Sequence, residues 1–262
     1  MLRRELRFLT ALWKANLQAA MEYRAAFVAQ VVGMMLNNAV YFAIWVVFFD
    51  RFGQVRGWQL GDMVLLFAVT ATGFGLAAVG FGNVLAMADV IAGGGLDYYL
   101  TLPRPVLVHV LASRSRYGGL GDVCYGVLTF ALLADAGPSA FARFALGSVL
   151  SMVVFVAFMV LVQSLAFWMG SASQLSAQSV NALLTFALYP ISLFDGTAKF
   201  LLFTILPAAF VGSVPAALVR DFTWPAFAQL AGAAFALLAL ALVVFHRGLR
   251  RYESGSAVRV QV

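Results

Sequence analysis

The chain has 262 residues, of which 63% are hydrophobic and only 11% are charged, and its mean hydropathy is +0.93. Soluble domains are about half apolar and about a quarter charged, so this composition excludes a soluble protein and indicates an integral membrane protein. The net charge of +6 does not indicate nucleic-acid binding, because basic residues beside membrane spans follow the positive-inside rule. The single cysteine, Cys124, excludes an internal disulfide and a thiolate metal cluster.

Residues 1–24 are predicted to form an amphipathic helix that lies in the membrane interface. Apolar residues recur at helical spacing, and basic residues occupy the opposite side. The apolar set is Leu2, Leu6, Leu9, Trp13, Leu17 and Ala20, and the basic set is Arg3, Arg7 and Lys14. The charges exclude the long uncharged core of a cleaved signal peptide. The pattern is typical of a helix in the headgroup plane, and a helix packed on another protein would also fit it.

A membrane-spanning helix requires about 20 apolar residues, and by that measure the chain contains six candidate spans. Their predicted ranges are 25–49, 60–87, 106–134, 144–169, 180–194 and 225–245, followed by a tail at 246–262. The connections are too short for a soluble domain. We therefore expect an all-α integral membrane fold with residues 1–262 as one transmembrane domain.

The second predicted span contains an unusual number of glycines. They are Gly73, Gly75, Gly80 and Gly82, and in a lipid-embedded helix such residues allow close approach of a neighbouring helix. A nucleotide-binding glycine loop would require a preceding strand, and the sequence indicates none.

The stretch GGGLDYYLTLPRP, residues 93–105, interrupts the apolar chain between the second and third spans. The glycines are expected to end the second span, LDYYLTL is long enough for about two helical turns, and Pro103 ends that helix. The helix would present Leu96, Tyr98, Tyr99 and Leu100, with Asp97 and Arg104 as its charges. Such a short, stiff aromatic element suits docking into a partner's groove. An interfacial loop with its tyrosines in the aromatic belt is the alternative.

Residues 195–224 are apolar but are interrupted by Gly196, Pro207, Gly212, Pro215 and Arg220. Each uninterrupted piece is too short to cross a bilayer, which predicts a re-entrant or interfacial element before the last span.

Charge asymmetry predicts the orientation. With six crossings, one side holds only Arg51, Arg56, Arg143, Lys199 and Arg220, and the other side holds the rest of the 17 lysines and arginines. Both termini and residues 93–105 are therefore expected on the cytoplasmic side, and residues 195–224 on the extracellular side.

Polar residues within the spans are candidates for helix contacts or for a translocation path. Asp122 lies a few residues into the apolar part of the third span, which starts near Tyr117. We expect it to pair with Arg116 or a neighbouring helix, or to line a path. The weaker candidates of the same kind are Asn37, Asn38, Asn83, Gln163, Gln174 and Asn181. His109 and His246 lie far apart near cytoplasmic boundaries, so we expect no metal site and no catalytic residue.

Together these features resemble the permease subunits of type-2 ABC exporters. The resemblance rests on the basic N-terminal helix, six spans, the broken segment before the last span, and G-x-L-D-x-x-L-x-x-P at Gly94–Pro103. YPISLF at Tyr189–Phe194 and ILPAAFVGSVPAAL at Ile205–Leu218 are similar to a branch of small bacterial permeases formerly grouped as a domain of unknown function. The resemblance covers essentially the whole chain.

The resemblance implies a half-transporter in the bacterial plasma (inner) membrane. Its translocation path would form between two permeases, identical or homologous, driven by a dimer of cytoplasmic ABC ATPase subunits. Residues 93–105 would be the coupling helix, with Gly94, Leu96, Asp97, Leu100 and Pro103 matching the motif. We add Tyr98, Tyr99 and Arg104 to the expected ATPase-coupling residues because we expect their side chains to be exposed. Residues 1–24 would brace the ATPase contact, and residues 195–224 would be the re-entrant extracellular element.

The chain itself shows no means of binding ATP. A Walker A loop requires Gly-Lys-Ser/Thr, whereas Lys14 follows Trp13 and Lys199 follows Ala198. We therefore expect no cofactor on this chain and no enzymatic activity, with ATP and Mg on the partner ATPase.

Two other functions remain open. A channel or secondary transporter predicts inverted repeats and a charged midplane site, but the first three spans do not resemble the last three. A membrane scaffold that transports nothing fits the glycine-rich spans as well. The phenylalanine-rich spans are compatible with a hydrophobic or amphipathic cargo, although phenylalanine facing bulk lipid is the commoner cause.

Overall fold

The computed structural model describes residues 2–134, 137–170 and 172–253. Within these ranges the chain forms α-helices and short 3₁₀ helices, and the sole extended pairing is an isolated bridge between Val55 and Trp58. In the described residues, four helical runs are long and apolar enough to cross a membrane: 3–52, 60–92, 138–169 and 224–249. A bent helix pair within 196–220 is a possible fifth. The all-α membrane fold is thus confirmed.

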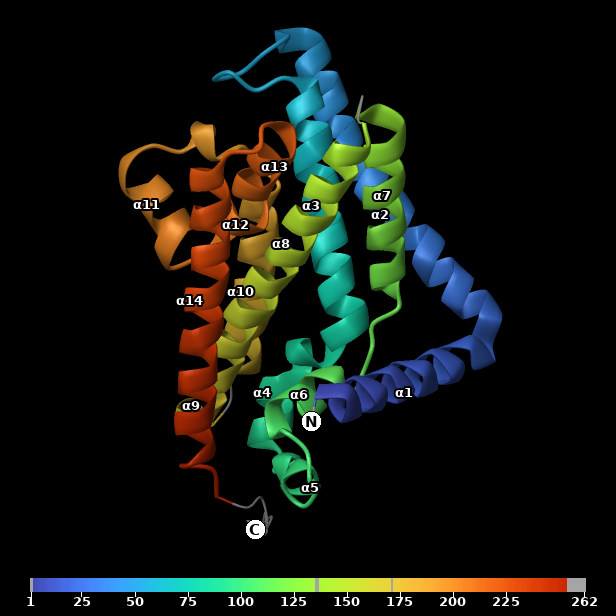
Figure 1. Cartoon of the computed structure of the whole chain (residues 1–262), viewed down its shortest axis with the longest axis vertical. Coiled ribbons are helices and arrows are strands. Elements are labelled where there is room, and N and C mark those ends of the chain that lie inside the picture. Colours follow the sequence, from blue (N-terminus) through green and yellow to red (C-terminus); the bar gives the residue numbers. More distant parts are fainter. Residues whose placement is uncertain (1, 135–136, 171, 254–262) are drawn as a thin grey trace.

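The N-terminal part consists of two helices joined by one 3₁₀ turn. α1 (Leu2–Ala20) runs from beside α6 outward in the lower part of Figure 1, below α7, and α2 (Arg24–Phe52) rises from its end after η1 (Met21–Tyr23). Tyr23 has non-helical angles, φ −107 and ψ 69, and this residue is where the direction changes.

The centre of the bundle is α3 (Leu60–Phe81), flanked by α7 (Gly118–Leu133) and α8 (Pro138–Ser164). α10 (Ser173–Ala187) and α14 (Trp224–Leu249) complete it (Figure 1). Large side chains of α3, including Met63, Leu66 and Phe67, are almost completely buried. The core therefore runs along α3, and the other helices are arranged around it.

Glycines make the contact between α3 and α7 unusually close. A Cβ atom on Gly75 would lie 2.4 Å from the carbonyl oxygen of Gly119, and one on Gly126 would lie 2.2 Å from Thr72 Oγ1. No real side chain fits at such distances, so the backbones pack directly against each other. The predicted role of the glycines in helix approach is confirmed for Gly75, and also for Gly73, which packs on Ser151 of α8.

The second predicted span is not one continuous α-helix. α3 ends at Phe81, a 3₁₀ segment η2 (Gly82–Ala86) follows, and α4 (Met87–Ala92) completes the run. Such a break frees backbone groups, which require partners when they are buried. Gln163 of α8 supplies one, because its Oε1 accepts a hydrogen bond from Ala88 N at 2.8 Å.

The third predicted span is also divided, into α6 (Val106–Ala112) and α7. Between them, Arg116 N donates to the carbonyl oxygen of Ala78 on α3 at 2.9 Å. Asn83 Nδ2 donates to Val110 O and to Ser113 Oγ, both at 2.9 Å. These contacts with α3 and η2 hold the interruption in place.

Other predicted ranges shift at their ends. The fourth helix begins at Pro138, where proline fits the first helical position, and α9 (Ala166–Met169) follows it. The fifth lies at Ser173–Ala187 instead of 180–194, and it ends before Tyr189-Pro190 because the residue before proline avoids helical geometry.

Residues 195–224 form three short helices at the end of the bundle opposite α1 (Figure 1). They are α11 (Gly196–Thr204), α12 (Ala208–Val211) and α13 (Ser213–Arg220), preceded by η3 (Ile191–Leu193). The chain bends by 62° between α11 and the α12–α13 pair. α12 and α13 are largely buried, whereas α11 is mostly exposed.

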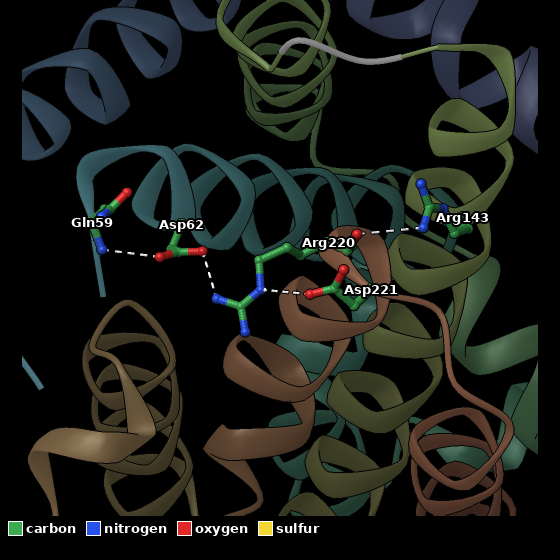
Figure 2. A network of polar contacts seen from close by, with 5 residues as sticks. All are labelled: Gln59, Asp62, Arg143, Arg220 and Asp221. Atoms are coloured by element: carbon green, nitrogen blue, oxygen red, sulfur yellow. Dashed lines mark hydrogen bonds and ion pairs between the residues drawn. The ribbon is translucent and has the colours of Figure 1, made fainter. Parts of the chain in front are cut away.

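A polar network fastens α13 to its neighbours (Figure 2). Arg220 Nη1 lies 2.7 Å from Asp62 Oδ1 at the start of α3, and its Nε lies 3.2 Å from Asp221 Oδ2. Asp62 also accepts from Gln59 N, and Arg143 of α8 donates to the carbonyl oxygen of Arg220. The hydrogen bond that Arg220 donates to the Asp62 carboxylate raises the pKa of Arg220. Arg220, predicted as an interruption, therefore joins α3, α8 and α13.

Candidate coupling surface and polar cavity

α5 (Leu96–Leu100) lies at the lower tip of the molecule, below α4 and α6 (Figure 1). Gly94 adopts φ +76, and Gly95 N donates to Val90 O at 2.8 Å, so the glycines end α4 with a left-handed residue as predicted. α5 has five residues and is shorter than the two turns expected from LDYYLTL. It ends at Leu100 because Leu102, which precedes Pro103, is disfavoured in a helix.

The side chains of α5 divide into an anchored set and an exposed set. Leu96 is completely buried and belongs to the main hydrophobic core, whereas Tyr98 is 64% exposed and Leu100 is 46% exposed. The expectation that Leu96 faces a partner is therefore wrong, because its side chain turns inward to pack in that core. Tyr99 packs its ring edge-on against His109, with the centroids 5.0 Å apart. Tyr98 and Leu100 form the exposed tip of α5.

Asp97 lies beside the end of α14. Burial, and then the nearby Asp97 carboxylate, raises the pKa of the Tyr252 phenol. Gly94, Pro103 and Arg104 flank the helix, with Pro103 exposed and Arg104 turned toward α1. The motif residues therefore lie together at one end of the molecule.

A cluster that we call the brace connects α1 to α5 and α6; it consists of Glu5, Phe8, Tyr99, Arg104 and His109. Arg104 Nη1 lies 2.7 Å from Glu5 Oε1, and its guanidinium lies 4.8 Å from the centre of the Phe8 ring. His109 lies between Phe8 and Tyr99, with ring centroids 4.9 and 5.0 Å away. Burial and the neighbouring Arg104 lower the pKa of His109.

The remaining contacts of α1 correct its predicted apolar face. Trp13 Nε1 donates to Gly80 O at 2.8 Å, and Asn16 Nδ2 donates to Ala112 O at 3.3 Å. Leu6 and Leu17, predicted on the same face as Trp13, are 53% and 36% exposed. The side facing the protein is rotated relative to the predicted apolar face, because aromatic and polar side chains make the contacts. Leu6 and Leu17 lie away from these contacts, so α1 packs on protein with one side and leaves part of its apolar face exposed.

A cavity of about 740 Å³ lies among α2, α3, α7 and α10. Its polar lining residues are Asn37, Asn38, Thr70, Asp122, Asn181 and Thr185. Aromatic side chains, among them Tyr41, Trp45 and Phe74, line much of the rest. The ring centroids of Trp45 and Tyr189 lie 5.3 Å apart, and this contact joins α2 to the residues just after α10.

Asp122 is 3% exposed, and its Oδ1 accepts a hydrogen bond from Asn38 Nδ2 at 2.6 Å. Its Oδ2 is buried without a hydrogen-bond partner among the described residues. Of the two expected pairings, the one with a neighbouring helix is found and the one with Arg116 is not. Asn181 also lines the cavity, whereas Asn83 lies outside it and joins η2 to α6.

No group of three or more His, Cys, Asp or Glu in the described ranges could hold a metal ion. Glu5 and Phe8 are site residues that the sequence does not single out, although Glu5 is the sole acid of the first turn of α1. Asn38 is a predicted polar candidate, but the sequence does not indicate its partner.

Comparison with known families shows what the chain is similar to. The family model described as ABC-2 family transporter protein matches residues 35–256, which is most of the chain. The chain belongs to this ABC-2 transporter family. No curated protein and no solved structure matches it.

Membership in the ABC-2 family makes the chain a multi-pass permease of an ABC transporter, a class that normally takes its ATPase from a partner subunit. The matched range includes the tip of α5 and nearly all of the cavity lining. α1 lies outside it, so Glu5 and Phe8 of the brace come from a segment that the family model does not cover.

Proposed function

We propose that the chain is one permease of an ATP-driven exporter in the bacterial inner membrane, and that the exposed tip of α5 docks on a separate ABC ATPase. One observation carries the proposal: Tyr98 and Leu100 project from a helix whose Leu96 and Tyr99 are held by the rest of the protein. A helix of five residues is not stable by itself in water. The tertiary contacts of Leu96 and Tyr99 therefore hold α5 in place, and a helix that passes movement from an ATPase to the membrane helices must be held in this way.

The contacts of α5 supply two routes by which a movement of the ATPase would reach the membrane. One route leads through α4 and η2 into α3, because Leu96 packs in the same core as Ile91 and Met87. The other leads through Arg104 and Glu5 into α1, which continues as α2. ATP and Mg would be bound by the partner ATPase dimer, and the part of this chain in ATP hydrolysis would be limited to the coupling contact.

We assign six crossings to α2, α3 with α4, α7, α8, α10 and α14. α7 and α10 have 16 and 15 residues, and a helix of about 15 residues rises about 22 Å. These two crossings therefore require a locally thin bilayer or polar flanking groups. The even number is supported by Figure 1, in which α1 begins and α14 ends at the same end as α5. That end carries most of the basic residues, so we place it in the cytoplasm.

We further propose that a second permease, identical or homologous, packs against α2 and closes the translocation path. The described part of α2 exposes Val28, Val32, Leu36, Val40 and Val47, which follow helical spacing. The opposite side of α2 lines the cavity. α12 and α13 would be the re-entrant extracellular element.

The test is purification of the tagged protein from gently solubilised membranes, with and without the Tyr98→Ala substitution. Recovery of a stoichiometric ATPase with wild type, and its loss with Tyr98→Ala, is the expected result. Tyr23→Ala is the matched control, because Tyr23 is 72% exposed and lies at the junction of α1 and α2, away from α5. Equal recovery of ATPase with Tyr98→Ala would contradict docking at α5. A stable preparation with no ATPase would favour a channel or a scaffold.

A further inference from the structure

In the part of the chain that the structure describes, the lining of the cavity among α2, α3, α7 and α10 contains an acidic side chain and no basic one. Asp122 is the sole Asp, Glu, Lys, Arg or His among its described lining residues. The other polar lining groups are amides, hydroxyls, the indole of Trp45 and the phenols of Tyr41 and Tyr189, which carry no charge at neutral pH. The lining therefore offers one acid and no base to anything that enters.

Asp122 is incompletely satisfied. Asn38 donates to Oδ1, but Oδ2 has no hydrogen-bond partner, and no cation among the described residues forms an ion pair with either oxygen. A buried acid without a cation is unfavourable at membrane depth and usually marks a functional site. A positively charged group in the cavity would supply the missing partner, whereas an anion would be repelled.

The rest of the lining suits an apolar body. Tyr41, Trp45, Phe67 and Phe74 contribute aromatic rings, and aromatic faces attract organic cations through cation–π contacts. The volume of about 740 Å³ lies within the usual range of about 300–1,000 Å³ for small-molecule sites.

We propose that this cavity binds amphipathic organic cations, with Asp122 as the counter-charge, Asn38 as the residue that orients the carboxylate, and the aromatic rings as the surface for the apolar body. The proposal rests on the permease function proposed above, since it names the class of cargo. Asn38 acts through Asp122, so it is a positioning residue.

Two probes of the same size and shape but opposite charge test the proposal: tetraphenylphosphonium and tetraphenylborate. Saturable binding of radiolabelled tetraphenylphosphonium is measured on the purified full-length chain, with the signal of empty micelles subtracted. Wild type is expected to bind the cation, and Asp122→Asn to bind it about tenfold or more weakly, the scale expected for a lost charged partner. Radiolabelled tetraphenylborate is measured in separate samples, because the two ions pair with each other in solution, and it is expected to show no saturable binding.

Two further variants keep the result interpretable. Asp50→Asn removes one negative charge from an exposed position near the end of α2, outside the cavity lining, and should bind like wild type. Thr185→Phe fills space at an exposed lining position and leaves Asp122 and Asn38 unchanged. It should weaken binding even where Asp122→Asn folds poorly.

Cation binding by Asp122→Asn within twofold of wild type, or saturable binding of tetraphenylborate with similar affinity, would overturn the proposal. So would the absence of saturable binding to wild type. ATPase recovery is measured on the same preparations. An ATPase that co-purifies while cation selectivity is missing would refute the cargo class and leave the permease function standing.

Discussion

Two apolar helices, α2 and α3, have similar hydropathy but very different surroundings. The apolar 18-residue stretches that mark the runs 3–52 and 60–92 as candidate spans have mean hydropathies of 1.8 and 2.1, yet 6% of the first stretch is buried and 67% of the second. α3 is enclosed by α7 and α8, whereas α2 packs on one side and leaves the other open. Hydropathy identifies what can enter lipid, but the glycine pattern identifies what can be surrounded by other helices.

The largest expected effect comes from filling the contact between α3 and α7. In Gly126→Ala the new Cβ would lie 2.2 Å from Thr72 Oγ1 and 2.5 Å from the carbonyl oxygen of Ala68. The backbone oxygen cannot rotate away, so the helices must separate, and we expect the free energy of unfolding to fall by about 1–3 kcal/mol. The measurement is thermal unfolding in detergent.

Gly232→Ala is the matched control for that substitution. Gly232 lies on α14 with nothing within 4 Å of the added Cβ. Alanine has the higher helix propensity, so stability should be unchanged or should rise by up to about 1 kcal/mol. Equal destabilisation by both substitutions would show that the α3–α7 contact is not specially close.

The open side of α2 predicts a cross-linking pattern. In a Cys124→Ser background, Val40→Cys places a thiol at a position of α2 that is 67% exposed. If a second copy packs there, oxidation should give a disulfide-linked dimer. Leu240→Cys, 51% exposed on α14, is the control and should stay monomeric. Cross-linking at residue 240 alone would move the permease interface to α14.

The sequence determined more about element types than about contacts. The amphipathic N-terminal helix, the role of Gly75 and the left-handed residue at Gly94 all follow from local rules, and the structure contains each of them. The interruption at 113–117 does not, because it depends on a hydrogen bond from Arg116 N to Ala78 of another helix. Likewise, Asn38 and Asp122 are 84 positions apart, so no local pattern could pair them.

The brace connects α1, which leads into α2, with α5 and α6, and its residue His109 predicts that stability depends on pH. Burial and Arg104 lower the pKa of His109 below its usual value of 6.5. As the pH falls through about 6.5, the imidazole of His109 gains a proton more readily in the unfolded chain than in the folded chain. Acidification therefore lowers the free energy of unfolding. His109→Phe keeps an aromatic ring between Phe8 and Tyr99 and should show a smaller fall in melting temperature between pH 7.5 and pH 5. An identical pH profile would exclude His109 as the source.

The smallest expected effect is that of the ion pair between Glu5 and Arg104. Both side chains are about one-third exposed, at 31% and 30%, so water screens much of their attraction. A double-mutant cycle with Glu5→Gln and Arg104→Gln should give a coupling energy of up to about 1 kcal/mol, which decreases as salt is added.

The same ion pair also tests which of α2 and α3 responds to the ATPase, because it joins α1, which continues as α2, to the loop after α5. If this route carries the motion of the ATPase to α2, Glu5→Gln should lower the transport per ATP hydrolysed by a larger factor than the small loss of stability explains. Unchanged transport with the expected small loss of stability would leave the path through Leu96 and α4 as the route, and α3 instead of α2 as the helix that responds to the ATPase.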